Sequence, residues 1–551
     1  MKPEELDVRA AAEIARQESF DVRLICCSST GCQSSGGAET VSRLKAELRA
    51  RQLETKVQMC GTGCLGLCSR GPLILMKSKA QQDLLFADMK PGLAKAVIEQ
   101  VVEPVLGGAA IEHPGGDLER HTLDLDQPFF TMQEHVVLEN SGRIDPEKLD
   151  DYLACGGYQG LKRAMTMSPE AICKEILDSG LRGRGGGGVF TGKKWNETRK
   201  VESEAKYIVC NGDEGDPGVF MDRSVLEGDP HAVIEGMLIA ARAMNATQGV
   251  FYIRVEYPVA LERIEKALRQ ARAAGLAGKN ILDSGWNFDF EVRLGAGAFV
   301  CGEQTALVAS IEGLRGTPRP RPPALSVKGL WDEPTCVNNV ETLANVPRIL
   351  LRGAEWFASR GTEQSKGTKV FALTGKIKNS GLVEVPMGVT LRQIVEVIGG
   401  GTGTDRKVKA IQTGGPSGGM IPEHQFDTPV SYEHLQKLGS MMGSGGMIVI
   451  DDHDSVVELA RFYLDFCVDE SCGKCAPCRI GGTQMLHLLD RFVAGKGRPN
   501  DIKTIRTIAH AMHKGSLCAL GRSAPDPTLS ALRHFESEFL ERIQPAGTTE
   551  S

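Results

Sequence analysis

The sequence has no apolar run long enough to cross a membrane, no excess of positive charge and no apolar leader. None of its apolar runs approaches the roughly 18 to 20 residues that span a bilayer. Its formal net charge is −6, whereas a nucleic-acid-binding protein needs a basic face. The first 20 residues carry acids throughout and have no apolar centre, which argues against a signal or transit peptide. We therefore expect a soluble, cytoplasmic protein that binds no nucleic acid and does not insert into a membrane.

The length of 551 residues exceeds what one hydrophobic core supports and predicts three to five domains of roughly 100 to 200 residues. The order strand, helix, strand near the N-terminus predicts a small α/β unit, and a larger α/β unit with glycine-rich junctions follows. Short alternating strands with one helix come next, and the chain turns helical from about residue 439. The expected units are residues 1–110, a polar linker at 111–128, and then 129–365, 366–435 and 436–551.

Cysteine, in contrast, is plentiful, with 16 residues. In a reducing compartment, cysteines at short spacings bind metal more often than they form disulfides. Cys27 and Cys32 enclose four residues and Cys64 and Cys68 enclose three, each pair in a loop after an expected strand. Four thiolates in two such pairs suit a 2Fe-2S cluster, and a zinc site with four cysteines is the alternative.

A second cysteine group lies near the C-terminus. Cys472, Cys475 and Cys478 form a Cx2Cx2C motif in ESCGKCAPCRIGG, and Cys518 follows in SLCALG. Three close thiolates and one remote thiolate are typical of a 4Fe-4S cluster, whereas zinc usually prefers two pairs. The other eight cysteines are expected to be small buried apolar residues.

The stretch 180–195, GLRGRGGGGVFTGKKW, is called the glycine loop here. Six glycines between Gly183 and Gly192 allow backbone N–H groups to approach a phosphate or a flat ring closely. Four basic side chains suit the same anionic cofactor: Arg182, Arg184, Lys193 and Lys194. The GxGxxG spacing is not the ordinary dinucleotide fingerprint, because residues 169–179 before it look helical instead of extended. A flexible surface loop is the alternative.

Further junctions follow in order: NGDEGDPG from Asn211, the strand GVFYIRVEYP, GAGAFVCGE, RPRPP and NNVETL. Together with the glycine loop and the cysteine motifs, they resemble the flavin-bearing NADH-oxidising subunits of complex I, NAD-linked hydrogenases and formate dehydrogenases. The resemblance covers almost the whole chain and favours iron and sulfur over zinc. It implies an α/β multidomain fold: a thioredoxin-like 2Fe-2S domain, a Rossmann-like FMN and NAD(H) domain, a β-grasp module and a helical bundle with a 4Fe-4S cluster.

The resemblance also implies site residues. Glu303 and Glu214 are the candidate catalytic residues, which position the reactants because hydride transfer needs no general base. The implied cofactor-binding residues are Gly183, Arg184, Gly185, Gly186, Gly188, Lys194, Asn211, Asp213, Glu214, Asp216, Tyr252, Gly302, Glu303, Gln304, Asn338, Asn339 and Thr342. The implied cluster ligands are Cys27, Cys32, Cys64, Cys68, Cys472, Cys475, Cys478 and Cys518.

The implied activity is that of an NAD(P)H:acceptor oxidoreductase, or diaphorase, module. It exchanges a hydride between NAD(H) and FMN and passes single electrons through the clusters to partner subunits, since the chain contains no second-substrate site. The fusion of both cluster motifs on one chain favours a bidirectional nickel-iron hydrogenase. The beta subunit of a formate dehydrogenase and a complex I-like dehydrogenase are alternatives, and a non-catalytic cluster-bearing scaffold is an alternative of another class.

Three short motifs depart from the family pattern. Val189 and Phe190 stand where an aromatic residue and a proline are usual, and Asp216 is shorter than the usual glutamate. Gln304 replaces a glutamate whose charge would repel a 2′-phosphate, so the sequence predicts weaker discrimination against NADP(H).

Overall fold

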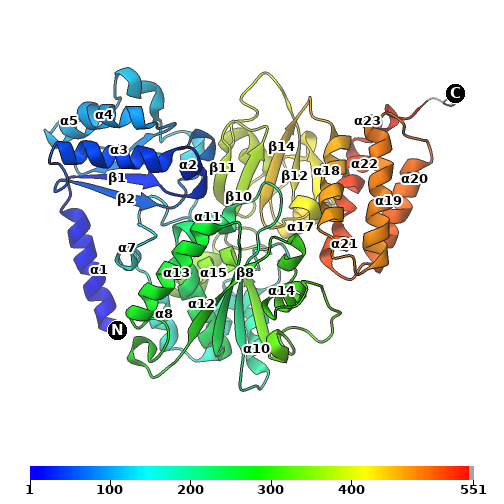
Figure 1. The fold of residues 1–551 in the computed structure, drawn as a ribbon, viewed down its shortest axis with the longest axis horizontal. Coiled ribbons are helices and arrows are strands. Elements are labelled where there is room, and N and C mark those ends of the chain that lie inside the picture. Colours follow the sequence, from blue (N-terminus) through cyan, green and yellow to red (C-terminus); the bar gives the residue numbers. More distant parts are fainter. Residues whose placement is uncertain (545–551) are drawn as a thin grey trace.

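The computed structural model describes residues 1–544, which form three β-sheets surrounded by helices and a helical bundle at the C-terminal end (Figure 1). Within this range, none of the helices is both long and apolar enough to cross a bilayer. The sequence-based expectation of a mixed α/β chain is therefore confirmed at the level of secondary structure.

The N-terminal sheet has the order β2 (Val57–Thr62), β1 (Val22–Cys27), β3 (Ile74–Ser78), β4 (Leu84–Phe86) and β5 (Thr122–Leu123). Strands β1 and β2 are parallel, and the other neighbours are antiparallel. Its helices are α2 (Thr30–Ser34), α3 (Gly37–Ala50), α4 (Ala94–Val97) and α5 (Glu103–Leu106).

The segment 111–128 differs from the expected free linker. Its 3-10 helix, Gly116–His121, leads into β5, which pairs with β4 and so extends the N-terminal sheet. Leu118 is completely buried in the core of this sheet and anchors the segment. Ile111 also packs against this core, so a segment that is mostly polar is attached through a few apolar residues.

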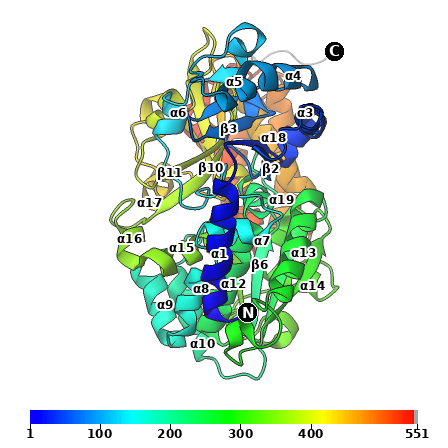
Figure 2. The ribbon, with the colours of Figure 1, turned by 90° about the vertical axis from the view of Figure 1, so that its left-hand side faces the viewer.

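Helix α1 (Pro3–Glu18) extends from the N-terminal sheet along the central part of the molecule (Figures 1 and 2). It packs on α7 (Leu149–Ala154), where Arg9 forms an ion pair with Asp150 at 2.6 Å. Asp7 forms a second ion pair, at 2.8 Å, with Lys162 of α8 (Gln159–Met165). Leu6 of α1 is completely buried in the central core, so an apolar contact holds this helix together with the two ion pairs.

The central sheet is entirely parallel, with the order β8 (Asp289–Gly295), β7 (Gln248–Arg254), β6 (Tyr207–Gly212) and β9 (Thr335–Asn339). Helix α12 (Pro230–Met244) is buried at every residue except Arg242, as expected of a helix that is apolar on all sides. The other helices around this sheet are α9 (Pro169–Asp178), α10 (Thr191–Lys200), α11 (Met221–Gly228), α13 (Pro258–Ala273), α14 (Gln304–Ile311), α15 (Val340–Arg352) and α16 (Ala354–Ala358).

The third sheet is mixed, with the order β11 (Gly381–Pro386), β10 (Thr368–Gly375), β14 (Gly446–Asp451), β12 (Val408–Thr413) and β13 (Gly419–Pro422). Strand β14 lies at its centre, although residue 439 was the expected start of the helical region. Its short apolar run, residues 447–450, cannot be assigned from periodicity alone, and pairing with β10 and β12 makes it a strand.

The helical bundle begins at α18 (Val456–Asp469) and continues with α19 (Ala476–Val493), α20 (Asp501–Gly515), α21 (Ala519–Ser523), α22 (Asp526–His534) and α23 (Glu536–Leu540). Its core includes Leu464, Leu489 and Phe492, all completely buried. The bundle docks on the mixed sheet, where the backbone N–H of Met420 donates to Ser530 Oγ at 2.9 Å.

Candidate cofactor cavity and cysteine centres

A cavity of about 280 Å³ opens at the carboxyl ends of β6 and β9. The chain crosses from β6 to β7 in one direction, and β9 lies on the other side of β6, so these two strands flank the point where the strand order reverses. Open parallel sheets bind ligands at this point. The glycine loop, turns of the mixed sheet and the start of α21 complete the wall.

The structure gathers part of the predicted cofactor set around this cavity. The predicted residues that line it are Gly185, Gly186, Asn211, Asp213, Glu214, Asp216, Gly302, Glu303 and Asn339. Gly186 has a φ of +105°, and a Cβ there would lie 3.3 Å from the backbone of Gly443. Only glycine adopts this conformation without strain while the two loops lie so close together.

The basic side chains of the glycine loop do not line the cavity. Arg184 is completely buried, and its Nη2 donates to the carbonyl of Lys366 at 2.7 Å. Lys194 donates to the carbonyl of Val337, and Arg182 forms an ion pair with Glu433. In this structure the three side chains contact other protein groups, and backbone groups of the glycine loop line the cavity. Contact of Arg184 and Lys194 with a cofactor stays a prediction.

The remaining predicted residues also lie outside the lining. Gly183 accepts a 2.8 Å hydrogen bond from the Tyr432 hydroxyl, and a Cβ on Gly188 would touch the same ring. Tyr252 bonds to Ser310, Trp195 donates to Asn338, and the backbone N–H of Arg184 donates to the hydroxyl of Thr342. Gln304 is the half-buried first residue of α14.

Glu214 and Glu303 both line the cavity and both cap a helix. Glu214 accepts hydrogen bonds from the backbone N–H groups of Asp222 and Arg223, at 2.8 and 2.9 Å, in the first turn of α11. Glu303 caps α14 through the N–H groups of Thr305 and Ala306, and it forms an ion pair with Arg321. Both carboxylates therefore fix the walls of the cavity, which fits a positioning role.

Burial changes the acid–base state of the cavity. It raises the pKa of Asp213 to about 7 and that of Asp216 to about 6, and it also raises the pKa of Glu214 and, strongly, of Asp222. The Oδ2 atom of Asp213 is buried without a hydrogen-bond partner within the protein. A buried polar atom of this kind favours a ligand that completes its hydrogen bonding.

Part of the cavity wall comes from the mixed sheet and the helical bundle, and its residues were not among the predicted site residues. The mixed sheet contributes Gly414, Ser417, Met441, Gly443 and Ser444, and the bundle contributes Ala519 and Leu520. Ser444 donates to Asp216 Oδ2 at 2.7 Å, so it holds a buried acid of the cavity. The glycine-rich turn 414–419 was the one sequence feature that suggested contact with the cofactor, but tight turns alone also explain such a sequence.

The N-terminal cysteine centre consists of Cys27, Cys32, Cys64 and Cys68. Cys27 is within hydrogen-bonding range of both Cys32 and Cys64, and the sulfur atoms of Cys64 and Cys68 are 3.4 Å apart. The four predicted ligands thus form one continuous chain of thiol contacts. The loop with Cys64 and Cys68 also lies against β11, where the N–H of Leu382 donates to Gly66 O at 2.8 Å.

The C-terminal cysteine centre consists of Cys472, Cys475, Cys478 and Cys518. Cys475 receives a backbone hydrogen bond from Leu517 at 3.3 Å, which ties the three-cysteine loop to the segment of the fourth. Cys472, Cys478 and Cys518 pack against one apolar cluster that also includes Leu520. The proline-rich segment covers this loop, since Arg315 and Lys474 donate across it to Cys472 O and Pro318 O.

The thiols of the two centres are not placed as ligands of one ion. Across residues 1–544, no three or more Cys, His, Asp and Glu side chains converge on a position suited to a single metal. A multi-iron cluster spreads its ligands over several metal atoms.

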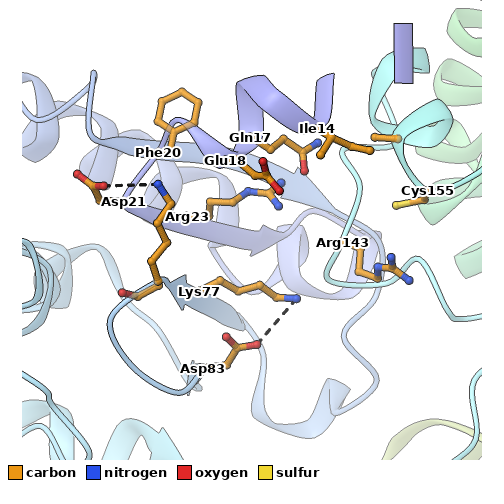
Figure 3. A pocket seen from close by; sticks show the side chains of 13 residues that line it. Ile14, Gln17, Glu18, Phe20, Asp21, Arg23, Lys77, Asp83, Arg143 and Cys155 are labelled. Carbon is orange, nitrogen blue, oxygen red and sulfur yellow. Dashed lines mark ion pairs between the residues drawn. The ribbon is translucent and has the colours of Figure 1, made fainter. Parts of the chain in front are cut away.

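A larger pocket, of about 480 Å³, lies between α1 and the N-terminal sheet (Figure 3). Its lysines are already paired, Lys79 with Asp21 and Lys77 with Asp83. None of the predicted site residues lines it, and we therefore assign the cofactor site to the smaller cavity.

Comparisons with known proteins agree with this geometry. Residues 176–348 match the family model of the Nuo51 FMN-binding domain, and residues 458–542 match that of the NADH-ubiquinone oxidoreductase-F iron-sulfur binding region. The NADP-reducing hydrogenase subunit HndC of Solidesulfovibrio fructosivorans is 51% identical over 407 residues, which cover 74% of this chain and 83% of that protein.

A subunit of a quinone-reducing complex and a solved hydrogenase structure are also similar to this chain. The F subunit of NADH-quinone oxidoreductase from Escherichia coli is 41% identical over 408 residues, 73% of this chain and 92% of that protein. The crystal structure of an air-oxidised NAD+-reducing [NiFe]-hydrogenase matches with a TM-score of 0.66 and 27% identity, covering 100% of this chain and 90% of that chain.

The fold and the site define an FMN-dependent oxidoreductase of nicotinamide nucleotides that carries an iron-sulfur region. The chain belongs to the family of flavin-bearing NADH-oxidising subunits of complex I and NAD(P)-linked hydrogenases. Its cofactors are FMN, NAD(H) and a 4Fe-4S cluster, as the resemblance implied.

Proposed function

We propose that the chain is the diaphorase subunit of a multisubunit hydrogenase. It exchanges a hydride between NAD(P)H and FMN held in the cavity, and it delivers electrons singly to partner subunits. In this proposal the N-terminal sheet is the thioredoxin-like 2Fe-2S domain and the parallel sheet is the Rossmann-like domain. The mixed sheet is the β-grasp module, and the bundle carries the 4Fe-4S cluster. A cytoplasmic location stays a prediction of the sequence.

FMN, when bound, supplies the group that takes up a pair of electrons with a hydride and releases them one at a time. The protein's own residues orient and enclose it. Glu214 and Glu303 hold the helix starts that form the wall, and Asn211 donates to Gly302 O at 3.0 Å. The free Oδ2 of Asp213 offers a hydrogen bond to a polar edge of the ring system, while Phe299 and Leu520 add apolar wall that excludes water.

The cofactor cavity and the C-terminal cysteine centre share part of their walls, and this observation carries the proposal. Ala519 and Leu520, which line the cavity, directly follow Cys518 in the chain. Leu520 also packs in the apolar cluster that contacts Cys472, Cys478 and Cys518. The cavity and the C-terminal centre therefore contact the same side chain, and a short separation of this kind favours transfer of single electrons between them.

We propose Cys27, Cys32, Cys64 and Cys68 as ligands of a 2Fe-2S cluster. Their continuous contacts and the burial of the first three support this assignment. The full-length match to the NAD+-reducing hydrogenase structure includes this N-terminal region, which also supports a hydrogenase over the other redox complexes of the family.

We infer that NADP(H) is also a substrate. The neutral Gln304 follows Glu303, whose charge is offset by its ion pair with the half-exposed Arg321. A 2′-phosphate near this pair meets less negative charge than a second carboxylate would present. The 51% identity to a subunit named for NADP reduction supports the same inference.

The test is anaerobic purification with analysis of flavin, iron, zinc and sulfide, and identification of proteins that co-purify. One FMN and six iron atoms per chain with co-purified hydrogenase subunits are expected, because one 4Fe-4S and one 2Fe-2S cluster contain six iron atoms. Zinc without flavin would instead identify a non-catalytic scaffold, and a formate dehydrogenase or membrane partner would assign a different complex.

A further inference from the structure

Helix α11 connects the cofactor cavity to the N-terminal cysteine centre. Asp222 in its first turn lines the cavity, whereas Glu227 and Gly228 at its end contact both cysteine loops of the N-terminal sheet. The helix has 8 residues, which corresponds to a rise of about 12 Å. One short helix thus contacts both redox sites.

Glu227 binds the first cysteine loop through Thr30, which lies between Cys27 and Cys32. Its Oε2 accepts from the backbone N–H of Thr30 at 3.0 Å, and its Oε1 accepts from the hydroxyl of the same residue. The side chain of Glu227 is only 1% exposed. Two donors from one residue therefore hold a carboxyl group that water hardly reaches.

Arg263 of α13 completes the contact beside Cys27. Its Nη2 donates to Ser28 O and Oγ at 2.8 and 2.7 Å, and its Nη1 donates to the backbone carbonyl of Glu227. Arg263 is 3% exposed, so the contact places two buried groups of opposite charge next to the cysteine loop. The Glu227 carboxylate also forms an ion pair with Arg223 of the same helix, whose Nε lies 3.9 Å from Oε1.

The second cysteine loop meets the same end of α11 by close backbone packing. A Cβ built on Gly63 would lie 2.6 Å from the Cα of Gly228, which leaves no room for a side chain. Gly63 directly precedes Cys64. The two loops that carry the four thiols are therefore both positioned by α11.

We propose that Glu227 is a positioning residue that lowers the reduction potential of the N-terminal cluster. The inference rests on the proposed 2Fe-2S centre. A negative charge held in a poorly solvated position disfavours the arrival of another electron nearby. Hydrogen bonds to a cluster and the burial of the cluster also set its reduction potential. Glu227 also fixes the loop through Thr30, so the cluster keeps its place relative to the cavity.

The test is a redox titration of the full-length protein, purified anaerobically and followed by the electron paramagnetic resonance signal of the 2Fe-2S cluster. Glu227→Gln keeps the shape and removes the charge. We expect the ratio of reduced to oxidised cluster at a fixed potential to rise roughly tenfold, an upward shift of about 59 mV for one electron. Glu39→Gln removes an exposed acid of α3 in the same unit and is expected to leave the potential unchanged.

Two Thr30 variants separate an electrostatic role from a structural one. Thr30→Val removes the hydroxyl donor at nearly constant size. The negative charge of the Glu227 carboxylate then accepts one hydrogen bond fewer, which shifts the reduction potential of the cluster downward. Thr30→Ser retains the hydroxyl and should keep the wild-type potential. If Glu227→Gln does not fold, these two variants still show whether the Glu227 carboxylate affects the reduction potential.

Opposite shifts in Glu227→Gln and Thr30→Val support the inference. An unchanged potential in both variants, or shifts of the same sign, would overturn it while the wild-type signal still supports the 2Fe-2S centre. A wild-type protein without a 2Fe-2S signal and without the matching iron and sulfide would overturn the proposed centre itself.

Discussion

The N-terminal cysteine centre is enclosed between α11, α13 and β11, whereas the C-terminal centre lies at one end of a helical bundle. Cys27, Cys32 and Cys64 are buried, but all four thiols of the C-terminal centre are partly exposed. The first centre is held by contacts from distant parts of the chain, such as Thr30 to Glu227 and Leu382 to Gly66. The second is held largely within its own motif and by the proline-rich segment.

The two centres also differ in their relation to the cofactor cavity. The C-terminal centre shares Leu520 with the cavity wall, while the N-terminal centre lies at the other end of α11 from the cavity. Partial exposure leaves the C-terminal centre accessible to another protein. From this difference we predict that electrons leave through the C-terminal centre and that loss of the N-terminal centre has the smaller effect.

The largest expected effect separates the two centres directly. Cys518→Ser removes the ligand beside the cavity, and we expect electron delivery to the partner to fall by roughly two orders of magnitude or more. Cys64→Ser should abolish only the 2Fe-2S signal and reduce delivery much less. The measurement is NADH-driven reduction of the co-purified partner, with resonance spectra to record which cluster is lost. Equal losses in both variants would contradict the assignment of a single exit.

A smaller effect is expected at the contact between α11 and the second cysteine loop. Gly63→Ala forces a Cβ against the backbone of Gly228, an overpacking that costs about 1–3 kcal/mol. We expect lower 2Fe-2S content and a lower unfolding temperature of the N-terminal unit. Gly31→Ala is the matched control, because a Cβ at Gly31 meets nothing within 4 Å. Identical behaviour of the two variants would show that the backbone contact does not hold the loop.

A change of about tenfold is expected in the preference for NADPH over NADH at the cofactor cavity. Gln304→Glu adds a negative charge beside Glu303, which repels a 2′-phosphate more than a 2′-hydroxyl group. The ratio of kcat/KM for NADPH to that for NADH should fall about tenfold, or about 1.4 kcal/mol. Gln304→Leu, which adds no charge, is the control. An unchanged ratio in Gln304→Glu would reject the role of this position.

The smallest effect concerns Asp213 and the pH dependence of stability without cofactors. Because burial raises its pKa to about 7, the folded protein binds its proton more tightly than the unfolded chain does. Its contribution to stability is present below pH 4 and is lost as the pH rises through 7. Asp213→Asn should therefore reduce the fall in Tm between pH 6 and pH 8, by about 2–4 °C. A fall in the variant as large as in the wild type would exclude Asp213 as its source.

Local motifs identified the cysteines that the structure brings together, because the members of each pair or triplet lie close together in sequence. Their role as cluster ligands stays a prediction. The pairs Cys27 with Cys32 and Cys64 with Cys68 each follow a strand of the same sheet, and the structure joins them in one chain of contacts. The order of strands and glycine junctions likewise indicated where polar residues meet at the ends of β6 and β9.

Boundaries and side-chain directions were predicted less well. Strand β14 lies in the mixed sheet because two distant strands pair with it, and Leu118 turns the expected linker into part of the N-terminal sheet. The charge of Arg184 and Lys194 suggested contact with a cofactor, yet carbonyl groups from other segments accept their hydrogen bonds. A sequence contains the charge of a side chain but not its partner.

By itself, the sequence determined the spacing of the cysteine motifs and the order of the glycine-rich junctions, because both are local features of the chain. Through these motifs it resembles a family that binds FMN, NAD(H) and iron-sulfur clusters. Only the tertiary structure decided how these sites are related. It placed Leu520 between Cys518 and the cavity, and it placed α11 between the cavity and the N-terminal thiols. These relations arise from packing between units far apart in the chain, whose surfaces match only after each has folded.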